Sequence, residues 1–151
     1  MKEPKKQTPA KIRKLVIDKL TDECLAIWKQ CIFKQWGNKD IVTGNPANVA
    51  HHIIPRAESK WLKFDVDNGV PLEHNKTHYR IHNTPNHKDI DIKIENWCGK
   101  KRWKYLKDNY TRQISYNDVP TMLKVKEKLL KQLYGEGFIS SDDDFNKMLK
   151  V

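Results

Sequence analysis

Four histidines stand in two close pairs whose spacing suits metal-assisted hydrolysis. His78 and His82 are four residues apart, so on a helix both side chains project from one face and can bind one metal ion together. His51 and His52 end an apolar, strand-like segment, where neighbouring side chains point to opposite faces. One of this pair can therefore face a metal while the other faces a substrate. The combination predicts a Lewis acid beside a phosphate and a neutral imidazole placed to deprotonate water.

The segments around these histidines predict a hairpin, a loop and a helix. Residues 41–42 and 49–54 have strand-like composition, and the turn formers of residues 43–46 separate them, so we expect the two to pair as a short β-hairpin. The next elements are a loop over residues 55–67, a brief extended segment over residues 68–72 and a helix over residues 74–82. The first histidine pair thus ends a strand, and the second lies on a helix.

Helical patterns precede and follow this region. Thr8, followed by a proline, is typical of a helix start, and apolar residues then recur at helical spacing as far as Gly37. Thr21 looks like a second cap, which predicts either two helices or one broken helix. Asp118 caps a basic amphipathic helix that ends at the next glycine. The acidic residues 140–144 predict the start of a last helical turn.

The charge of the chain points to a polyanionic partner. Lys and Arg number 29 against 19 Asp and Glu, a formal net charge of +10. Residues 2–14 hold six basic residues and one acid. A second basic cluster, in which Trp103 and Tyr105 are placed to stack on bases, consists of Lys100, Lys101, Arg102, Lys104 and Lys107. Lysine runs also serve solubility alone, but two clusters beside hydrolytic histidines favour nucleic acid.

Three stretches carry a resemblance to a known family. They are Ala50-His51-His52-Ile53-Ile54-Pro55-Arg56, Asp67-Asn68-Gly69-Val70-Pro71-Leu72 and His78-Tyr79-Arg80-Ile81-His82. In order and spacing they resemble the HNH endonucleases, phage-encoded and mobile-element members in particular. The resemblance covers about residues 28–83, roughly a third of the chain.

The resemblance implies a role for each polar residue of these stretches. His51, His78 and His82 would bind one divalent metal ion, and His52 would be the general base that activates water. Asn68 would hold the loop and the orientation of His52 by hydrogen bonds. Three imidazoles suit Zn²⁺ or Ni²⁺, whereas hydrolysis in this family is often supported by Mg²⁺ or Mn²⁺. The products would carry 5′-phosphate and 3′-hydroxyl ends.

Four basic residues are the predicted DNA contacts. Arg56 follows the double histidine and is a candidate for binding a neighbouring phosphate, because Arg forms bidentate pairs with such oxygens. Lys100, Lys101 and Arg102 open the second basic cluster. We expect these three to bind the DNA backbone without regard to sequence.

The chain departs from many of these endonucleases in lacking two Cys-x-x-Cys knuckles that bind a structural zinc. The matching places hold Asp40 and Thr43 before the double histidine, and Glu73 with Lys76 or Thr77 after it. We therefore expect no structural zinc. We expect that an acidic residue facing Lys76 links the two segments instead. All the knuckle cysteines are absent together, as when a whole site is replaced.

A second departure concerns the helix that carries the last histidines. The stretch from Asn68 to His78 is one residue longer than in many family members. His74 lies four residues before His78 and shares its helical face, so both are candidates for the same ligand position. We prefer His78 as the ligand and place His74 at the surface or behind the ligands.

The predicted fold class is α+β, a ββα-metal (His-Me finger) core with flanking N- and C-terminal helices. Residues 1–20 would form a basic helical segment, residues 21–90 the nuclease core, and residues 91–151 a basic helical extension packed on the same domain.

Cysteine usage and hydropathy predict the compartment. Cys24, Cys31 and Cys98 form no Cys-x-x-Cys pair, which favours reduced thiols. The sequence has neither an apolar run long enough to span a bilayer nor a signal-peptide pattern. We therefore expect a cytoplasmic protein, in the host cell if phage-encoded, with no membrane partner.

Two functions remain in competition at this point. The first is a metal-dependent DNA endonuclease. The second is a non-catalytic DNA-binding or packaging accessory protein with the same fold, against which the intact double histidine argues, because a binder needs no general base. A zinc-dependent structural module lacks the cysteines it would need. The DNA target, the number of strands cut and the choice between monomer and homodimer stay open.

Overall fold

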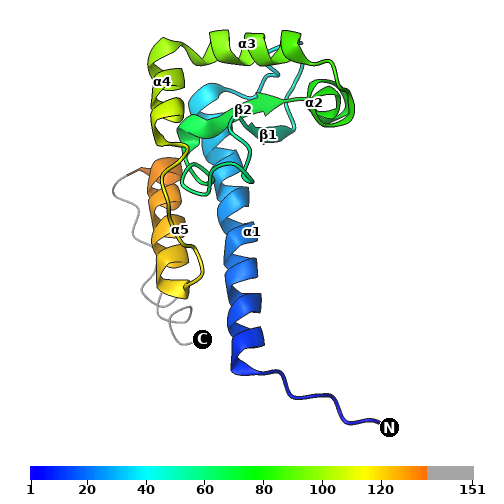
Figure 1. Ribbon diagram of the computed structural model, residues 1–151, viewed down its shortest axis with the longest axis vertical. Coiled ribbons are helices and arrows are strands. Elements are labelled where there is room, and N and C mark those ends of the chain that lie inside the picture. The colour runs from blue at the N-terminus through cyan, green and yellow to red at the C-terminus, as the bar shows by residue number, and fades with distance from the viewer. Residues whose placement is uncertain (136–151) are drawn as a thin grey trace. The chain divides into compact units, whose positions relative to one another are not determined.

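The computed structural model describes residues 1–135 of the 151-residue chain (Figure 1). The helical turn predicted to start within residues 140–144 lies outside the described residues. The described part is α+β, as predicted, with five α-helices and one small antiparallel sheet of two strands. The chain divides into two compact units, one of residues 1–27 with 115–151 and one of residues 28–114. The predicted boundaries after residues 20 and 90 both fall inside helices of these units.

The first unit contains two helical segments, the N-terminal part of α1 (Pro9–Trp36) and α5 (Val119–Tyr134). Both begin at the predicted caps: Thr8 Oγ1 accepts from the Lys11 amide at 3.4 Å, and Asp118 Oδ1 accepts from the Thr121 amide at 2.9 Å. The buried apolar residues of this unit are Leu20, Cys24, Met122, Leu123 and Leu129. None of the helices in residues 1–135 is both long and apolar enough to cross a membrane.

Helix α1 is continuous, so the predicted break at Thr21 is wrong. The Thr21 hydroxyl does not cap a new helix but donates to the carbonyl of Ile17, one turn earlier, at 2.8 Å. A threonine that bonds back to the preceding turn satisfies its hydroxyl inside a helix. The helix ends where predicted, because Gly37 adopts a φ of +91°, a left-handed conformation that glycine takes without strain.

The second unit is built around strands β1 (Val49–His52) and β2 (Gly69–Leu72), which pair antiparallel with His52 opposite Gly69 and His51 opposite Val70. A π-helical turn η2 (His74–His78) leads directly into α2 (Tyr79–Asn83), as the helical spacing predicted. Two further helices follow, α3 (Lys88–Cys98) and α4 (Lys100–Asn109), with Gly99 between them. Figure 1 shows β1, β2 and α2 side by side, with α3 running along them.

The hairpin predicted between residues 41–42 and 49–54 is wrong. Strand β1 pairs with β2 instead, and residues 39–46 close on themselves through a bridge between Lys39 and Pro46. The cause is Asp40, whose carboxylate accepts from the amides of Val42 and Thr43 at 2.7 and 2.9 Å and so turns the chain within three residues. Residues 41–42 thereby lose the extended conformation that a hairpin needs.

Two apolar clusters hold the second unit together. The first cluster includes one residue of α3 and one of α4 and consists of Ile54, Leu62, Cys98 and Leu106. The second lies between β2 and α3 and consists of Val70, Leu72, Ile90 and Ile94. All four residues of β2 are buried, so this strand forms the centre of the unit. The strand therefore gives β1 and its histidines a fixed position.

Gly69 sits where no larger residue fits. A Cβ built there would lie 2.1 Å from Cδ1 of Ile32 and 2.9 Å from Cζ2 of Trp28. We expect Gly69→Ala to lower the free energy of unfolding by about 1–3 kcal/mol, the usual cost of overpacking a core. Chemical denaturation would measure it. In a double mutant with Ile32→Val, which removes the nearest atom, we expect part of the loss to be recovered; a strictly additive double mutant would contradict this packing explanation.

Candidate active site

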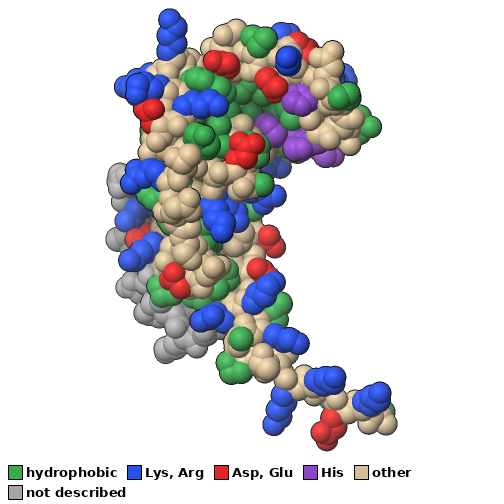
Figure 2. Space-filling view, in the orientation of Figure 1, with side chains coloured by type: hydrophobic (Ala, Val, Ile, Leu, Met, Phe, Trp, Pro, Cys, Tyr) green, Lys and Arg blue, Asp and Glu red, His purple; other side chains and the backbone are tan. Residues whose placement is uncertain are grey.

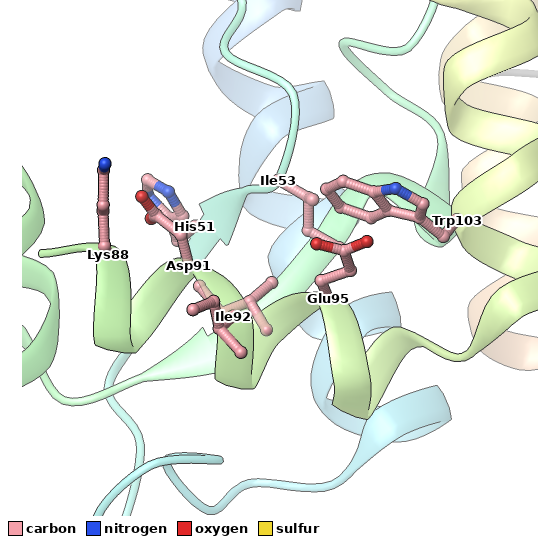
Figure 3. A pocket seen from close by; sticks show the side chains of 8 residues that line it. His51, Ile53, Lys88, Asp91, Ile92, Glu95 and Trp103 are labelled. Carbon is pink, nitrogen blue, oxygen red and sulfur yellow. The ribbon is translucent and has the colours of Figure 1, made fainter.

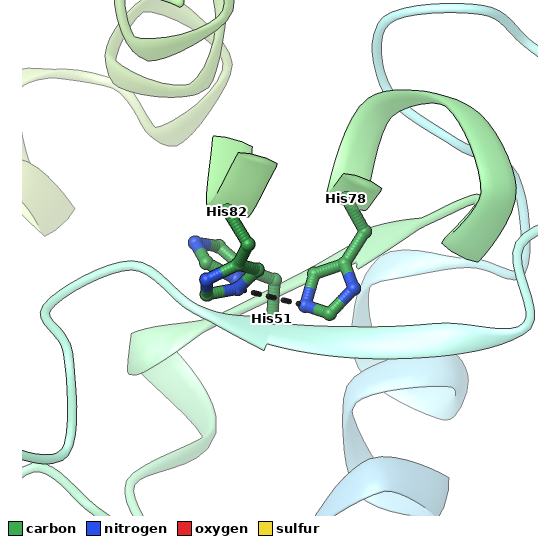
Figure 4. A group of neighbouring side chains, drawn as sticks. All are labelled: His51, His78 and His82. Carbon is green, nitrogen blue, oxygen red and sulfur yellow. Dashed lines mark hydrogen bonds between the residues drawn. The ribbon is translucent and has the colours of Figure 1, made fainter. Parts of the chain in front are cut away.

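Three histidines from separate elements converge on one point. His51 projects from β1, His78 from the end of η2 and His82 from α2, and one ring nitrogen of each lies within 4.8 Å of the others (Figure 4). The Nε2 atoms of His78 and His82 are 3.1 Å apart. Two imidazole ligands on one tetrahedral ion at 2.0–2.1 Å stand about 3.3 Å apart. The His78–His82 pair has this spacing, and together with His51 the three imidazoles could hold a metal ion. Figure 2 shows the histidines gathered on the surface of the second unit where α2 lies.

The environment of His51 and of His78 favours the neutral form of the imidazole, which is the form that binds metal. Burial, and then the nearby rings of His78 and His82, lower the pKa of His51 from 6.5 to about 3. Burial and the neighbouring His82 and His74 also lower the pKa of His78. Adding protons to rings this close together is unfavourable, so near neutral pH their lone pairs are available for a cation.

His74 lies behind the cluster rather than in it. Its Nδ1 is 3.4 Å from Nδ1 of His78, whereas the Nε2 of His78 faces His82. The sequence left open whether His74 or His78 occupies the ligand position. In the structure, His78 is the residue that lies close to both His51 and His82. His74 is placed to fix the ring orientation of His78 through its outer nitrogen, as residues behind metal ligands commonly do.

His52 projects from the opposite side of β1 and makes a different set of contacts. Its ring stacks on the indole of Trp28 with centroids 4.1 Å apart and planes 9° from parallel. Its Nε2 lies 2.7 Å from the carbonyl oxygen of Lys63. Because a carbonyl only accepts, Nε2 carries the proton, and in the neutral ring Nδ1 is left with a free lone pair. That nitrogen is the atom able to take a proton.

The same surroundings keep His52 neutral. Burial lowers the pKa of His52 to about 4, against the opposing effect of the hydrogen bond to Lys63, while the positive charges of Arg56 and Lys63 lower it further. The ring is therefore unprotonated over the whole physiological range. An activity that falls as pH drops through 6.5, as expected for an unperturbed histidine, is not expected from this residue.

Asn68 is completely buried and fixes the loop that supplies the Lys63 carbonyl. Its Nδ2 donates to the carbonyls of Ile54 and Leu62 at 3.0 and 3.1 Å, and its Oδ1 accepts from the Ile54 amide at 2.7 Å. Asn68 thus ties the end of β1 to the residue next to Lys63. This is the arrangement expected of a residue that holds the loop and orients His52.

Two parts of the site were not found from the sequence. Trp28 belongs to the apolar helical pattern that precedes Gly37, and besides being buried it stacks on His52 and donates from Nε1 to the Asp65 carbonyl at 2.8 Å. Its helical spacing gave no signal of this contact. The Lys63 contact uses a backbone oxygen, which every residue type possesses, so no sequence pattern could have marked it.

Asp40 links the segment of residues 40–43 to the segment that begins at Glu73. The side chain is 1% exposed, and its second oxygen accepts from the Glu73 amide at 2.7 Å. Burial alone would raise its pKa, but hydrogen bonds from the amides of Glu73, Thr43 and Val42 outweigh it and lower the pKa. The expected bridge to Lys76 is wrong, since Lys76 pairs at 3.9 Å with Glu73 of its own segment. The link is a buried carboxylate that accepts backbone hydrogen bonds.

We expect Asp40→Ala to lower the free energy of unfolding by about 2–4 kcal/mol, because it removes a buried carboxylate and leaves three backbone amides without their charged acceptor. The matched control is Asp108→Ala on α4, where an exposed pair with Lys104 is lost and the expected cost is about 0–1 kcal/mol.

A chelator should move the thermal transition of the wild type only slightly. Cooperative unfolding on chelation alone would show that a structural metal had been overlooked.

The predicted DNA contacts divide into two kinds. Arg56, Lys100 and Lys101 are exposed and free to meet a phosphate backbone. The Arg102 guanidinium instead lies 3.9 Å from the ring centre of Trp36 and donates to the carbonyls of Asp67 and Gly69 at 2.7 and 2.6 Å. These contacts favour a structural role for Arg102, since its donors already hold the start of β2.

Comparison of the chain with family models, with curated proteins and with solved structures gives no match.

Proposed function

We propose that this protein is a metal-dependent DNA endonuclease of the HNH type. The main support for the proposal is that the two neighbouring histidines of β1 have different surroundings. His51 joins His78 and His82 on one side, and His52, one residue further, meets the Lys63 carbonyl on the other. A metal-binding protein without catalysis has no use for a second, neutral imidazole whose Nδ1 is kept free.

The order of elements supports the same proposal. Two antiparallel strands, the first carrying both a metal-site histidine and its neighbour, lead into a helix that carries the other two histidines. We assign β1, β2 and the η2–α2 helix to a ββα-metal core. The remaining helices would surround that core.

The chain's own residues account for the hydrolytic step. His52 Nδ1 takes a proton from a water molecule as the water oxygen forms a bond to phosphorus, and the bond from phosphorus to the 3′ oxygen breaks. The departing 3′ oxygen takes a proton from solvent water, and His52 later returns its proton to solvent, which gives 5′-phosphate and 3′-hydroxyl ends. Asn68 and the Lys63 carbonyl keep the His52 ring from turning during the transfer.

A divalent ion held by His51, His78 and His82 would neutralise charge on the phosphate and stabilise the leaving oxygen. Three imidazoles bind Zn²⁺ and Ni²⁺ well, whereas Mg²⁺ and Mn²⁺ favour oxygen ligands, which water and the phosphate itself can provide. We propose Mg²⁺ or Mn²⁺ as the ion that supports cleavage.

DNA affinity should depend steeply on salt, because Lys100 and Lys101 displace counterions when they meet phosphates. We expect a Lys100→Gln, Lys101→Gln variant to lower the slope of log affinity against log salt by about 0.9 per lysine, equally for unrelated sequences. The matched control is Lys124→Gln with Lys128→Gln, two exposed lysines of α5. Fluorescence anisotropy across a salt series measures both. A change confined to one DNA sequence would mean that the cluster reads bases.

The experiment that tests the proposed function is cleavage of supercoiled, linear and branched DNA across a panel of Mg²⁺, Mn²⁺, Zn²⁺ and Ni²⁺. We expect cleavage that requires a metal and leaves ligatable 5′-phosphate ends. The competing function is a DNA-binding or packaging accessory protein that uses the basic surface alone. Salt-dependent binding without cleavage under any metal would favour it and reject the endonuclease.

A further inference from the structure

A pocket of about 390 Å³ adjoins the metal cluster and has no role in the proposed hydrolysis. It lies between β1 and α3, and its lining includes His51, Ile53, Lys88, Asp91, Glu95 and Trp103 (Figure 3). Its volume falls within the range of pockets that hold small organic groups. Because His51 belongs to both the pocket and the metal cluster, whatever fills the pocket lies beside the metal site.

The two ends of the pocket differ in chemistry. Figure 3 shows Lys88 and Asp91 at the end where His51 stands, and Glu95 with the Trp103 indole at the other end. Between them Ile53 provides an apolar wall. A group that fits must therefore be flat and apolar on its faces and polar at its edge, with its connection to the rest of the ligand near His51.

The far end can accept hydrogen bonds but offers no charged donor. Asp91 is already paired with the His87 ring at 3.0 Å. For Glu95, no side chain within residues 1–135 forms a hydrogen bond to the carboxylate. An ionised carboxylate only accepts, and two acids against the single ammonium of Lys88 make the lining net negative. A phosphate is therefore a poor occupant of the end formed by Glu95 and Trp103, and a neutral group with N–H donors is a good one there.

We propose that this pocket binds a DNA base that carries an exocyclic amino group, next to the phosphate that the enzyme cuts. The inference rests on the proposed function. The base packs against the part of the Trp103 indole that lines the pocket and donates its amino group to Glu95, while its own phosphate stays near His51 and Lys88. Lys107 also lies over the Trp103 ring, with Nζ 4.8 Å from the ring centre. Such a base is unpaired or turned out of the helix, since its pairing edge must be free.

The Glu95 carboxylate distinguishes bases that carry an exocyclic amino group from thymine, which carries none. Cytosine, adenine and guanine each offer an amino group to a carboxylate, and Glu to the cytosine amino group is a known mode of base recognition. Thymine presents carbonyl O4 at that position, which faces a carboxylate unfavourably. Cytosine and thymine are similar in size, so comparing them isolates the effect of the amino group.

Binding of short oligonucleotides tests the pocket without cleavage. In EDTA, we expect the full-length protein to bind labelled pentadeoxycytidylate about five- to tenfold more tightly than pentathymidylate, the effect of one charge-assisted hydrogen bond that is partly open to solvent. Glu95→Gln, whose amide both donates and accepts, should bring the two affinities together. Glu58→Gln, the same change at an exposed residue of the same unit, should keep the preference.

Cleavage with Mn²⁺ of oligonucleotides that differ only by C or T beside one phosphate separates the two proposals. Faster cutting beside C that Glu95→Gln abolishes supports both. Cleavage with no preference, in wild type and variant alike, together with equal affinities in EDTA, rejects the base pocket and leaves the endonuclease standing. A preference in EDTA that depends on Glu95, without cleavage under any metal, keeps the pocket and rejects the endonuclease.

Discussion

Replacing His52 by alanine is expected to lower the rate of DNA cleavage by about 10²–10⁴-fold, the usual contribution of a general base. Metal affinity should stay close to that of the wild type, because His52 faces Trp28 and the Lys63 carbonyl and takes no part in the three-histidine cluster. DNA affinity should also persist, since the exposed lysines are untouched. Single-turnover cleavage rates and metal titration by calorimetry measure the two effects separately.

The control for this variant is His87→Ala, which removes an imidazole that pairs with Asp91 and lies outside the cluster. It should cut DNA at a rate near that of the wild type.

The pH dependence of cleavage adds a second check on the role of His52. Because the pKa of His52 is lowered to about 4, the ring stays deprotonated as pH falls from 7.5 to 5.5, and its protonation alone would reduce activity only near pH 4. A His52→Ala variant that loses its metal would reverse the assignment.

Replacing His51 by alanine is expected to act through the metal. Residues that merely orient metal ligands change affinity by about 10–100-fold, so loss of a ligand should cost at least about 100-fold. Cleavage should disappear at ordinary metal concentrations and return in part when metal is raised, because His52 and its contacts remain. Calorimetry with Mn²⁺ and Ni²⁺, beside a metal titration of cleavage, measures both quantities.

His74→Ala is the matched variant for His51→Ala, since His74 belongs to the same group of rings but not to the cluster of three. We expect a loss of metal affinity within the range of about 10–100-fold and cleavage that high metal restores fully. A His51→Ala protein that binds metal as well as the wild type would show that the strand presents the other histidine to the ion.

The elements that carry the histidines were predictable because their patterns are local. Helical spacing gave the turn and helix over residues 74–83, and Asp118 marked the start of α5. Alternation along a strand placed His51 and His52 on opposite faces. The partner of β1 was not predictable from local pattern, because residues 41–42 and 69–72 have similar apolar composition and only the buried Asp40 turn removes the first from competition.

Arg102 makes packing contacts that its charge alone did not indicate. It was assigned to DNA with Lys100 and Lys101, although it stands four residues before the fully buried Leu106 on α4 and so shares its inward face. Two tryptophans flank its guanidinium: Trp97 precedes it by five residues, whereas Trp36 is distant in sequence and reaches it only in the folded chain. Helical periodicity was therefore a better guide to this side chain than its charge.

A link made by the Asp40 carboxylate responds to different conditions from a link made by a zinc ion and cysteine thiolates. A thiolate cage depends on the supply of zinc in the cell and is destroyed when oxidants attack its sulfurs. An aspartate that accepts three backbone hydrogen bonds depends on neither. Its pKa is lowered in the folded chain, so its contribution to stability is complete above the unfolded value of about 3.9 and is lost only as pH falls through the lower folded value. This link therefore requires neither zinc nor reduced thiols, and it weakens as acid protonates Asp40.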